Sequence, residues 1–208
     1  MFINQYCLIR HRSLISRGKV ILGAAKGTLD DFLDEAFLHV SPGYSKFHKM
    51  DRLSKLGFLA SEVVFRESPL FPYYAPEQVA LVLSNSFSST DTDLRFLDSI
   101  KTTPSPSLFV YTLPNIVAGE ICIRQGIKGE NAFFIFPEFD ARNMADYVTQ
   151  VMASEITTAC LAGWIDVMDE HHDVFLYLVE KRKTALGIEH TADQLQKIYT
   201  HDHGTTSG

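Results

Sequence analysis

The sequence predicts an α/β fold in which a mixed, mostly parallel sheet is covered by helices on both faces. Two observations predict it. Apolar runs of strand length alternate with amphipathic stretches of helical spacing, in the order strand, helix, strand, helix and then two strands in succession. The later strands are long apolar runs, as expected for strands that are buried on both faces. A sheet between two helix layers buries all of these apolar faces.

In the first half of the chain, an apolar segment at residues 5–15 precedes two predicted helices. A loop with two glycines leads into the first helix, which Thr28 caps and whose first turn contains Asp30 and Asp31. Its apolar face comprises Leu33, Phe37 and Leu38. The second helix has the clearest amphipathic pattern, because its apolar residues recur at helical spacing. They are Met50, Leu53, Leu56, Leu59, Val63 and Val64.

The rest of the chain is predicted to contain four strands and four helices. The strands cover residues 78–86, 132–136, 157–167 and 174–180. The helices cover residues 91–100, 114–126, 137–154 and 192–199. The third of these helices begins with Pro137 and Glu138, two residue types that are favoured in a first turn. We therefore expect one α/β domain at residues 1–189, followed by a short helix and a polar tail at residues 190–208.

Length, charge and hydropathy exclude several classes of protein. The 208 residues suit one medium-sized domain or one half of a larger architecture. The net charge of -6 argues against nucleic-acid binding, since the densest cation cluster, residues 181–183, is too short to follow a phosphate backbone. No apolar run approaches the roughly 20 residues of a membrane span, and the first residues lack the charge order of a secretory signal. We expect a cytoplasmic protein without a membrane span.

The three cysteines, Cys7, Cys122 and Cys160, show no CxxC or other ligand spacing, which argues against a disulfide framework and a zinc site. The segment TTACLAG at residues 157–163 has the small residues that often surround a reactive thiol. A thiolate needs a cation, a base or a helix N-terminus nearby, yet no Lys, Arg or His lies within ten residues of Cys160. We expect Cys160 to be buried and structural, unless a distant residue activates it.

Four segments in order carry a family resemblance: KMDRLSKLGFLASEVV at residues 49–64, SPSLFVYTLPNIVAGEICIRQGIKGEN at residues 105–131, the helix after it, and TACLAGWIDV at residues 158–167. Together they resemble the N-terminal half of β-ketoacyl synthases, the condensing enzymes of fatty-acid and polyketide assembly. The resemblance covers roughly residues 45–180, and it is closest to the short ketosynthase-like proteins of bacterial aryl-polyene-type gene clusters. It implies a thiolase-like half fold.

The resemblance also implies a site. In the family, the nucleophilic cysteine lies about seven residues after the Asn of the GIKGEN-type motif, at the N-terminus of a buried helix, and Glu138 takes that position here. The two catalytic histidines of the family come from its C-terminal half, and His171 and His172 occur too early to match them. The resemblance therefore implies a non-catalytic subunit without cofactors, similar to the chain-length factors of polyketide systems. A helix-start role for Glu138 is the simpler alternative.

A partner is implied by the strand that precedes this position. In the family that strand commonly meets its counterpart across a two-fold axis, which makes Asn131, Phe133, Phe134, Ile135 and Phe136 interface candidates. Successive side chains of a strand point to opposite faces, so one of the two adjacent Phe side chains needs additional cover. Either a partner or a helix of the same chain can supply it. The expected partner is a second copy or a ketosynthase, with an acyl carrier protein as a further candidate.

Two other functions remain open on the sequence alone. The chain could be an active 3-oxoacyl-carrier-protein synthase-like acyltransferase or a decarboxylase that uses Glu138, Cys160 or residues of a partner. Alternatively, the histidine segments at residues 169–173 and 201–203 could bind a metal or a small molecule. Adjacent histidines point apart on a strand and histidines in a tail are usually solvated, so we expect no metal site.

Overall fold

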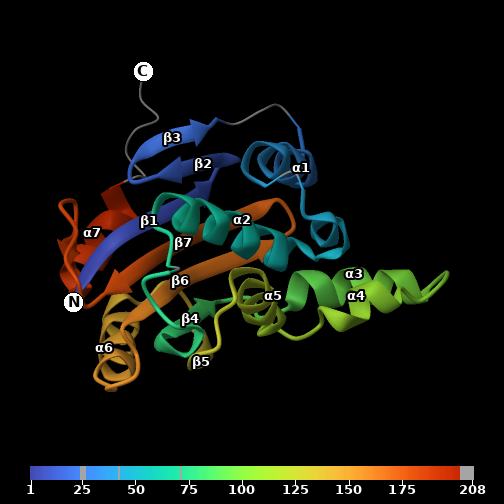
Figure 1. The fold of residues 1–208 in the computed structure, drawn as a ribbon. Coiled ribbons are helices and arrows are strands. Elements are labelled where there is room, and N and C mark those ends of the chain that lie inside the picture. Colours follow the sequence, from blue (N-terminus) through green and yellow to red (C-terminus); the bar gives the residue numbers. More distant parts are fainter. Residues whose placement is uncertain (24–26, 42, 71, 202–208) are drawn as a thin grey trace.

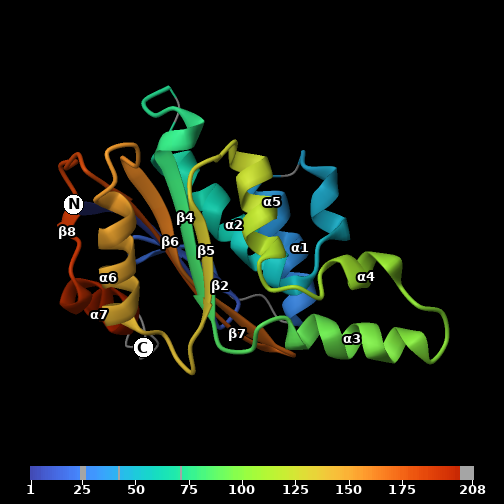
Figure 2. The same ribbon diagram turned by 90° about the horizontal axis from the view of Figure 1, so that it is seen from below.

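The computed structural model describes residues 1–23, 27–41, 43–70 and 72–201. One eight-stranded sheet lies between two layers of helices (Figures 1 and 2). Its strands follow the order β3-β2-β1-β7-β6-β4-β5, and β8 pairs with β1. Their bounds are β1 (Phe2–Arg10), β2 (Ser13–Ser16), β3 (Lys19–Leu22), β4 (Val79–Asn85), β5 (Asn131–Ile135), β6 (Ala159–Met168), β7 (His171–Glu180) and β8 (Ile188–Glu189).

Helices cover both faces of the sheet, as the sequence predicts. One layer contains α1 (Leu29–Val40), α2 (Arg52–Glu67) and α5 (Ile116–Gln125), and the opposite layer contains α6 (Ala141–Met152) and α7 (Ala192–His201). Helices α3 (Thr90–Ile100) and α4 (Pro106–Val110) project away from the sheet (Figure 2). Short 3-10 helices lie at Ser45–Lys49 and Pro76–Gln78. None of the described helices has both the length and the apolarity that crossing a membrane requires.

The predicted mixed sheet is confirmed, but its parallel part is smaller than the sequence suggests. Only β5, β4 and β6 run parallel, while β1, β2, β3, β7 and β8 join by antiparallel pairing. Two tight hairpins, β1–β2 and β6–β7, account for much of the antiparallel pairing. His11 and Arg12 adopt positive φ angles of 49° and 56°, which turns the expected single segment at residues 5–15 into strands β1 and β2. Asp169 (φ 53°) makes the corresponding turn between β6 and β7.

Strand β6 forms the centre of the core because it is paired on both sides and buried on both faces. Cys160, Ala162 and Trp164 point into the core beneath α6 and α7, whereas Leu161 and Ile165 point into the core beneath α2 and α5. Burying each large apolar side chain contributes about 1.5–3 kcal/mol to folding. The alternation explains why the sequence of this strand is apolar throughout.

Several predicted boundaries are wrong by a few residues. Helix α2 begins at Arg52, since the side chain of Asp51 caps it by accepting a hydrogen bond from the Ser54 amide. Strand β7 begins at His171, three residues earlier than its apolar run indicates. Leu38 is exposed, so only part of the predicted face of α1 is buried. Helix α4 was not predicted, because its proline-rich sequence is typical of a connector.

Gly163 provides a test of the packing between β6 and β7. Its φ angle is 152°, and a Cβ atom at this position would collide with the carbonyl oxygen of Phe175 on the neighbouring strand. Because backbone atoms cannot move aside cheaply, we predict that Gly163→Ala lowers the free energy of unfolding by about 2–4 kcal/mol. Urea denaturation followed by circular dichroism measures this change.

Gly119 is the matched control, because it lies exposed on α5 and no atom is within 4 Å of a Cβ placed there. Gly119→Ala is expected to raise the free energy of unfolding by about 0.5–1 kcal/mol, since alanine loses less backbone entropy in a helix. Equal effects of the two substitutions would show that the strand packing described for Gly163 is wrong.

Candidate functional site

A cleft of about 600 Å³ opens where the parallel strands end. The residues that follow β4 and β5, together with the last third of β6, form one side of it. The β1–β2 turn, the first residues of β7 and Tyr199 of α7 form the other side. Ligands of open α/β sheets bind outside the carboxyl ends of the parallel strands, and a volume of this size suits a small molecule. The cleft is therefore the candidate site.

Asp166 of β6 fixes the loop that follows β4. Its carboxyl group is buried and accepts hydrogen bonds from the Ser86 amide (3.0 Å), the Ser86 hydroxyl (2.8 Å) and the Phe87 amide (3.3 Å). Three donors satisfy much of the acceptor capacity of a buried carboxyl group. Asp166 thus holds one wall of the cleft in place.

Arg10, which is buried, and the partly buried Asp173 and Tyr199 form a second group on the opposite wall. Arg10 donates from Nε to Oδ1 of Asp173 (2.5 Å) and from Nη1 to the carbonyl oxygen of Tyr199 (2.6 Å), and its guanidinium carbon lies 4.3 Å from the centre of the Tyr199 ring. The Tyr199 hydroxyl donates to Asp173. Burial and the nearby Asp173 raise the pKa of Tyr199, so the hydroxyl stays protonated and keeps donating.

Glu138 lines the cleft but is not part of a helix. It is exposed, and within the described part of the chain it forms no hydrogen bond or ion pair. The predicted helix at residues 137–154 begins at Ala141 instead, because Asp140 caps it by accepting a hydrogen bond from the Asn143 amide (2.9 Å). Glu138 therefore lies two residues before the cap. Its carboxylate is not in the first turn of the helix, so it is not placed to interact with the helix dipole.

Cys160 lies away from the cleft. Its side chain is fully buried between Ala80 of β4 and Val179 of β7, its neighbours on the adjacent strands. Burial raises the pKa of the Cys160 thiol, and it raises the pKa of the Cys7 thiol in the same way. A thiol in such surroundings has little thiolate and no access to a substrate. The structure therefore offers no catalytic environment around Cys160.

The histidines with described positions are not arranged as a metal site. On β7, His171 is exposed whereas the neighbouring His172 is buried, so the two rings point apart. Among the residues with described positions, no group of three or more His, Cys, Asp and Glu side chains could hold a metal ion. His201 ends α7, and the candidate residue His203 lies outside the described residues.

Asp51 and Arg52, at the start of α2, support the β6–β7 turn that borders the cleft. Asp51 and Arg52 are both buried. Besides capping α2, Asp51 accepts a hydrogen bond from the Thr92 hydroxyl (2.6 Å), which ties α3 to α2. Burial raises the pKa of Asp51 despite these bonds. Pairing with neighbouring elements is thus the observed role.

Arg52 connects three elements at the β6–β7 turn. Its guanidinium donates to both carboxyl oxygens of Asp30 in α1 (2.9 and 2.6 Å) and to the carbonyl oxygen of Asp169 (2.8 Å), and it lies 3.5 Å from Glu170. Asp30 therefore has a lowered pKa, chiefly because of its hydrogen bond to Arg52. A guanidinium that donates to both oxygens of a carboxylate makes a strong and directional contact.

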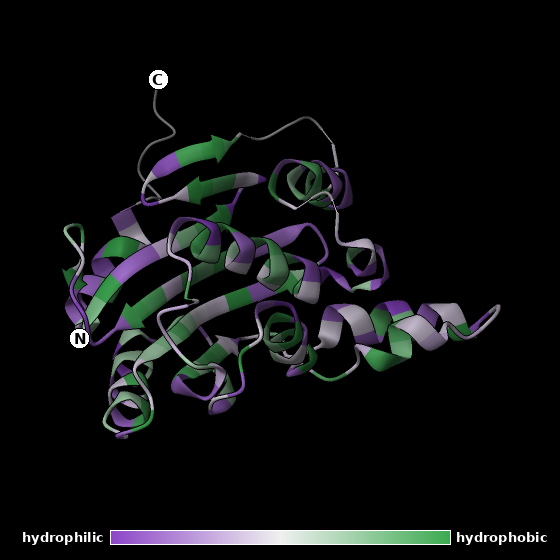
Figure 3. Ribbon diagram, viewed as in Figure 1, coloured by the Kyte–Doolittle hydropathy of each residue, from purple (hydrophilic) through white to green (hydrophobic). Residues whose placement is uncertain are grey.

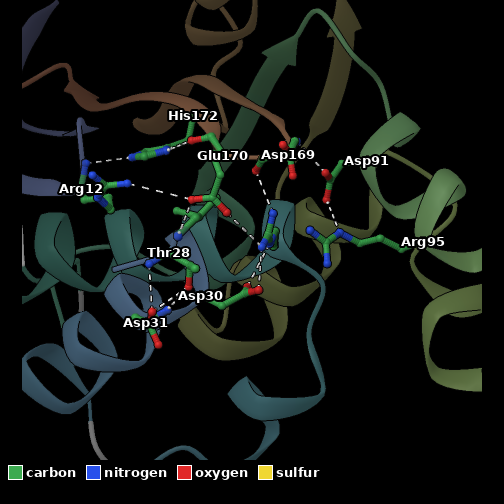
Figure 4. Close-up of polar contacts among 11 residues, drawn as sticks. Arg12, Thr28, Asp30, Asp31, Asp91, Arg95, Asp169, Glu170 and His172 are labelled. Atoms are coloured by element: carbon green, nitrogen blue, oxygen red, sulfur yellow. Dashed lines mark hydrogen bonds and ion pairs between the residues drawn. The ribbon is translucent and has the colours of Figure 1, made fainter. Parts of the chain in front are cut away.

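Neighbouring contacts complete this network around the turn (Figure 4). Asp91 of α3 accepts from the Asp169 amide (2.8 Å) and pairs with Arg95 (2.9 Å). Glu170 accepts from the Leu29 amide (2.7 Å), so it satisfies one of the unpaired N–H groups at the start of α1. The turn that borders the cleft is consequently bound to α1, α2 and α3.

Strand β5 forms a second candidate surface because it is an edge of the sheet. It pairs with β4, and no described strand lies on its other side. Phe133 packs on the α2–α5 side, while the ring of Phe134 packs against Tyr147 of α6 (4.7 Å) and Phe136 (5.6 Å). A helix of the same chain therefore covers the second Phe, which was one of the two alternatives. Ile135 is 51% exposed.

Exposed apolar side chains also lie on α5 and on the projecting helices, whose ribbons carry hydrophobic residues outside the core (Figure 3). They are Ile123 on α5, Leu94, Leu97 and Ile100 on α3, Phe109 and Val110 on α4, and Leu113 in the following loop. Scattered exposed apolar residues are normal, but a gathering of large ones is typical of an interaction surface. The edge of β5 and the α3–α4 arm lie on the side of the molecule seen in Figure 2.

Solved structures with this architecture include ketosynthases and chain length factors. The ishigamide ketosynthase/chain length factor matches with a TM-score of 0.64 at 16% identity, over 89% of this chain and 63% of that chain. The complex of the ketosynthase ApeO with its chain length factor ApeC from Xenorhabdus doucetiae matches with a TM-score of 0.56 at 10% identity, over 98% and 92%. The chain has a ketosynthase-like, thiolase-type fold. No family model and no curated protein sequence matches it.

A third structure contains a type II polyketide synthase acyl-carrier protein in complex with its ketosynthase bound to the hexaketide. It matches with a TM-score of 0.58 at 13% identity, over 86% of this chain and 62% of that chain. The chain thus spans less than two thirds of the first and third structures but nearly the full length of the matched chain from Xenorhabdus doucetiae. At these identities the ketosynthase-like architecture is what the chain shares with them.

Thiol labelling tests the placement of the cysteines. In the native protein we predict that Ellman's reagent modifies Cys122 first, because it is only half-buried, and leaves Cys7 and Cys160 unmodified. All three should react after unfolding in guanidinium chloride. Rapid labelling of Cys160 in the native state, located by mass spectrometry of peptides, would contradict its burial.

His172 makes the stability of the hairpins depend on pH. Its Nε2 accepts a hydrogen bond from the Arg12 amide (3.0 Å), its Nδ1 faces the carbonyl oxygen of Glu170 (3.0 Å), and burial lowers its pKa. A ring nitrogen that accepts must be unprotonated. The folded-state pKa is below the unfolded value of about 6.5, so the stability that the neutral ring contributes is present above pH 6.5 and is lost as the pH falls through the folded pKa.

We therefore predict that His172→Gln loses less stability than the wild type between pH 7 and pH 5, as measured by urea denaturation at both values. His171→Gln is the control, because that neighbouring side chain is exposed, and it should retain the wild-type dependence. Part of the dependence should persist in both variants, because burial and the N-terminal amine lower the pKa of His190 to about 4. Identical pH dependence in all three proteins would contradict the role of His172.

Proposed function

We propose that this protein is a non-catalytic, chain-length-factor-like subunit that pairs with a ketosynthase in fatty-acid or polyketide-type biosynthesis of the aryl-polyene kind. The observation that carries the proposal is the edge of β5, with which no further described strand pairs and on which Ile135 is exposed, on a ketosynthase-like fold. The match to the ApeO–ApeC complex supports a heterodimer, and the match to the carrier-protein complex supports an acyl carrier protein as a further partner. Pairing with a second copy is the alternative that the experiment below separates.

The proposed absence of catalysis is supported by the positions of the candidate nucleophiles. Condensation by the family mechanism needs an activated thiolate, and the thiol of Cys160 is buried in the core with a raised pKa. The residue that the resemblance places at the nucleophile position is Glu138, an exposed carboxylate in a loop. A carboxylate there cannot carry an acyl chain as a thioester.

The proposed pairing is supported by the chemistry of a sheet edge. The outer side of β5 presents unpaired N–H and C=O groups, which a strand of a partner can satisfy by extending the sheet. Ile135 and the apolar side chains of α3, α4 and α5 would be buried in the same contact. An extended edge next to an apolar surface is the combination that stable subunit interfaces need.

Substitution of Ile135 tests the pairing. Ile135→Asp introduces a charge into the proposed interface, so we predict that it weakens the complex with the partner ketosynthase at least tenfold in sedimentation velocity. Val20→Asp is the matched control, because Val20 is 57% exposed on β3, the opposite edge of the sheet, and should not affect the complex. A strictly monomeric wild-type protein, alone and with the ketosynthase, would overturn the proposal.

Activity assays test the catalytic part separately. The chain alone is expected to neither condense nor decarboxylate malonyl and acyl thioesters on a carrier protein. If it does either, and Glu138→Ala abolishes the reaction, then Glu138 is catalytic and the alternative of an acyltransferase or decarboxylase is correct. Radiolabelled malonyl thioester, followed by release of carbon dioxide, detects both reactions.

A further inference from the structure

Two arginine nitrogens at the wall of the cleft have no acceptor among the residues that the structure describes. Arg10 uses Nε and Nη1 for Asp173 and Tyr199, but its Nη2 is buried and makes no hydrogen bond with any described residue. The Nε atom of Arg12, in the adjoining turn, is likewise buried without an acceptor. Buried donors are nearly always satisfied in native proteins, so these two call for an acceptor from outside the chain.

The carboxyl groups of Asp166 and Asp173 do not supply those acceptors, because they are bound to other donors of the chain. Asp166 accepts from the loop after β4, and Asp173 accepts from Arg10 and Tyr199. The side chain of Arg10 is only 4% exposed, so its guanidinium is held rigidly by its partners. A fixed guanidinium with an unused N–H edge binds a carboxylate or phosphate more strongly than a mobile surface arginine does.

The rest of the cleft wall next to Arg10 is aromatic. Phe139 lies at its centre, with its ring 4.4 Å from that of Tyr199 and 6.3 Å from that of Trp164. Phe87 and Pro137 contribute further apolar surface. Such a wall favours a flat apolar group that can stack on or lie edge-to-face against the rings.

We propose that the cleft binds a small aromatic carboxylate, whose carboxylate accepts hydrogen bonds from Nη2 of Arg10 and whose ring packs against Phe139 and Trp164. This binding site goes beyond the proposed pairing role and does not depend on it. A monoanion fits better than a phosphate dianion, because Glu138, Asp166 and Asp173 surround the cleft and repel a second negative charge. The volume of about 600 Å³ leaves room for a ligand larger than a single ring.

Trp164 allows a direct test, since it is the only tryptophan in the sequence and it lines the cleft. Benzoate should change the tryptophan fluorescence of the full chain in a saturable manner, with a dissociation constant in the millimolar range or tighter. Benzamide has the same shape without the charge and should bind at least tenfold more weakly, because it lacks the charge-assisted hydrogen bond. Inorganic phosphate should neither change the fluorescence nor displace benzoate.

Variants identify the residue that holds the anion. Arg10→Gln should weaken benzoate binding at least tenfold and leave benzamide binding unchanged, whereas Lys19→Gln on β3 removes a charge far from the cleft lining and should affect neither. Circular dichroism checks the fold of Arg10→Gln. If that variant does not fold, side-chain NMR of the wild type replaces it, and the Nε signal of Arg10 should shift on addition of benzoate.

Three results would overturn the proposal. The absence of any saturable change with benzoate would mean that water alone satisfies the two arginines. Binding of phosphate in preference to benzoate would mean that the site takes a different anion. Equal affinity of the folded Arg10→Gln variant and the wild type, or an unshifted Arg10 signal in the benzoate complex, would mean that Arg10 does not hold the carboxylate.

Discussion

The forked contact of Arg52 is the interaction on which the rest of this structure depends. One buried guanidinium joins α1 through Asp30 and the β6–β7 turn through the Asp169 carbonyl, and Asp51 beside it joins α3. Arg52 is buried but its partners Asp30 and Glu170 are each nearly half exposed, so removing one partner costs less than it would in a fully buried ion pair. The turn has a residue at positive φ and would be poorly defined without these contacts, so the same interaction that packs the helices also shapes the cleft.

This arrangement separates the two candidate surfaces physically. The cleft is built at the carboxyl ends of the strands by long-range polar contacts, whereas the β5 edge and the α3–α4 arm expose large apolar side chains, and the long-range polar contacts of the arm lie at the start of α3, at Asp91 and Thr92. A rigid polar cleft suits a small ligand, and an uncovered apolar edge suits a protein partner. The proposed subunit role therefore rests on the edge, and the proposed carboxylate site rests on the cleft. The buried thiol of Cys160 belongs to neither surface.

The sequence predicts those features that depend on neighbouring residues. The apolar spacing of α2, the apolar run of β6 and the Thr28 cap of α1 are all local, and the structure contains them. The β1–β2 hairpin was missed because its turn uses His11 and Arg12 at positive φ in place of glycine. The start of α6 was misplaced because Pro137 and Glu138 are residue types favoured in a first turn, whereas Asp140 is the residue that caps the helix. The cleft could not be predicted, because Arg10 and Asp173 are 163 residues apart in the sequence.

Hydrogen exchange of an Arg52→Met variant tests most directly whether this residue holds the edge of the cleft. The amides of residues 169–172 should exchange at least tenfold faster than in the wild type. The amides in the middle of β6 and β7 should remain the more strongly protected ones, as in the wild type. Arg95→Met is the control, since its partner Asp91 still accepts from the Asp169 amide, and it should leave exchange at the turn nearly unchanged. Equal exchange rates at the turn in Arg52→Met and the wild type would contradict the account.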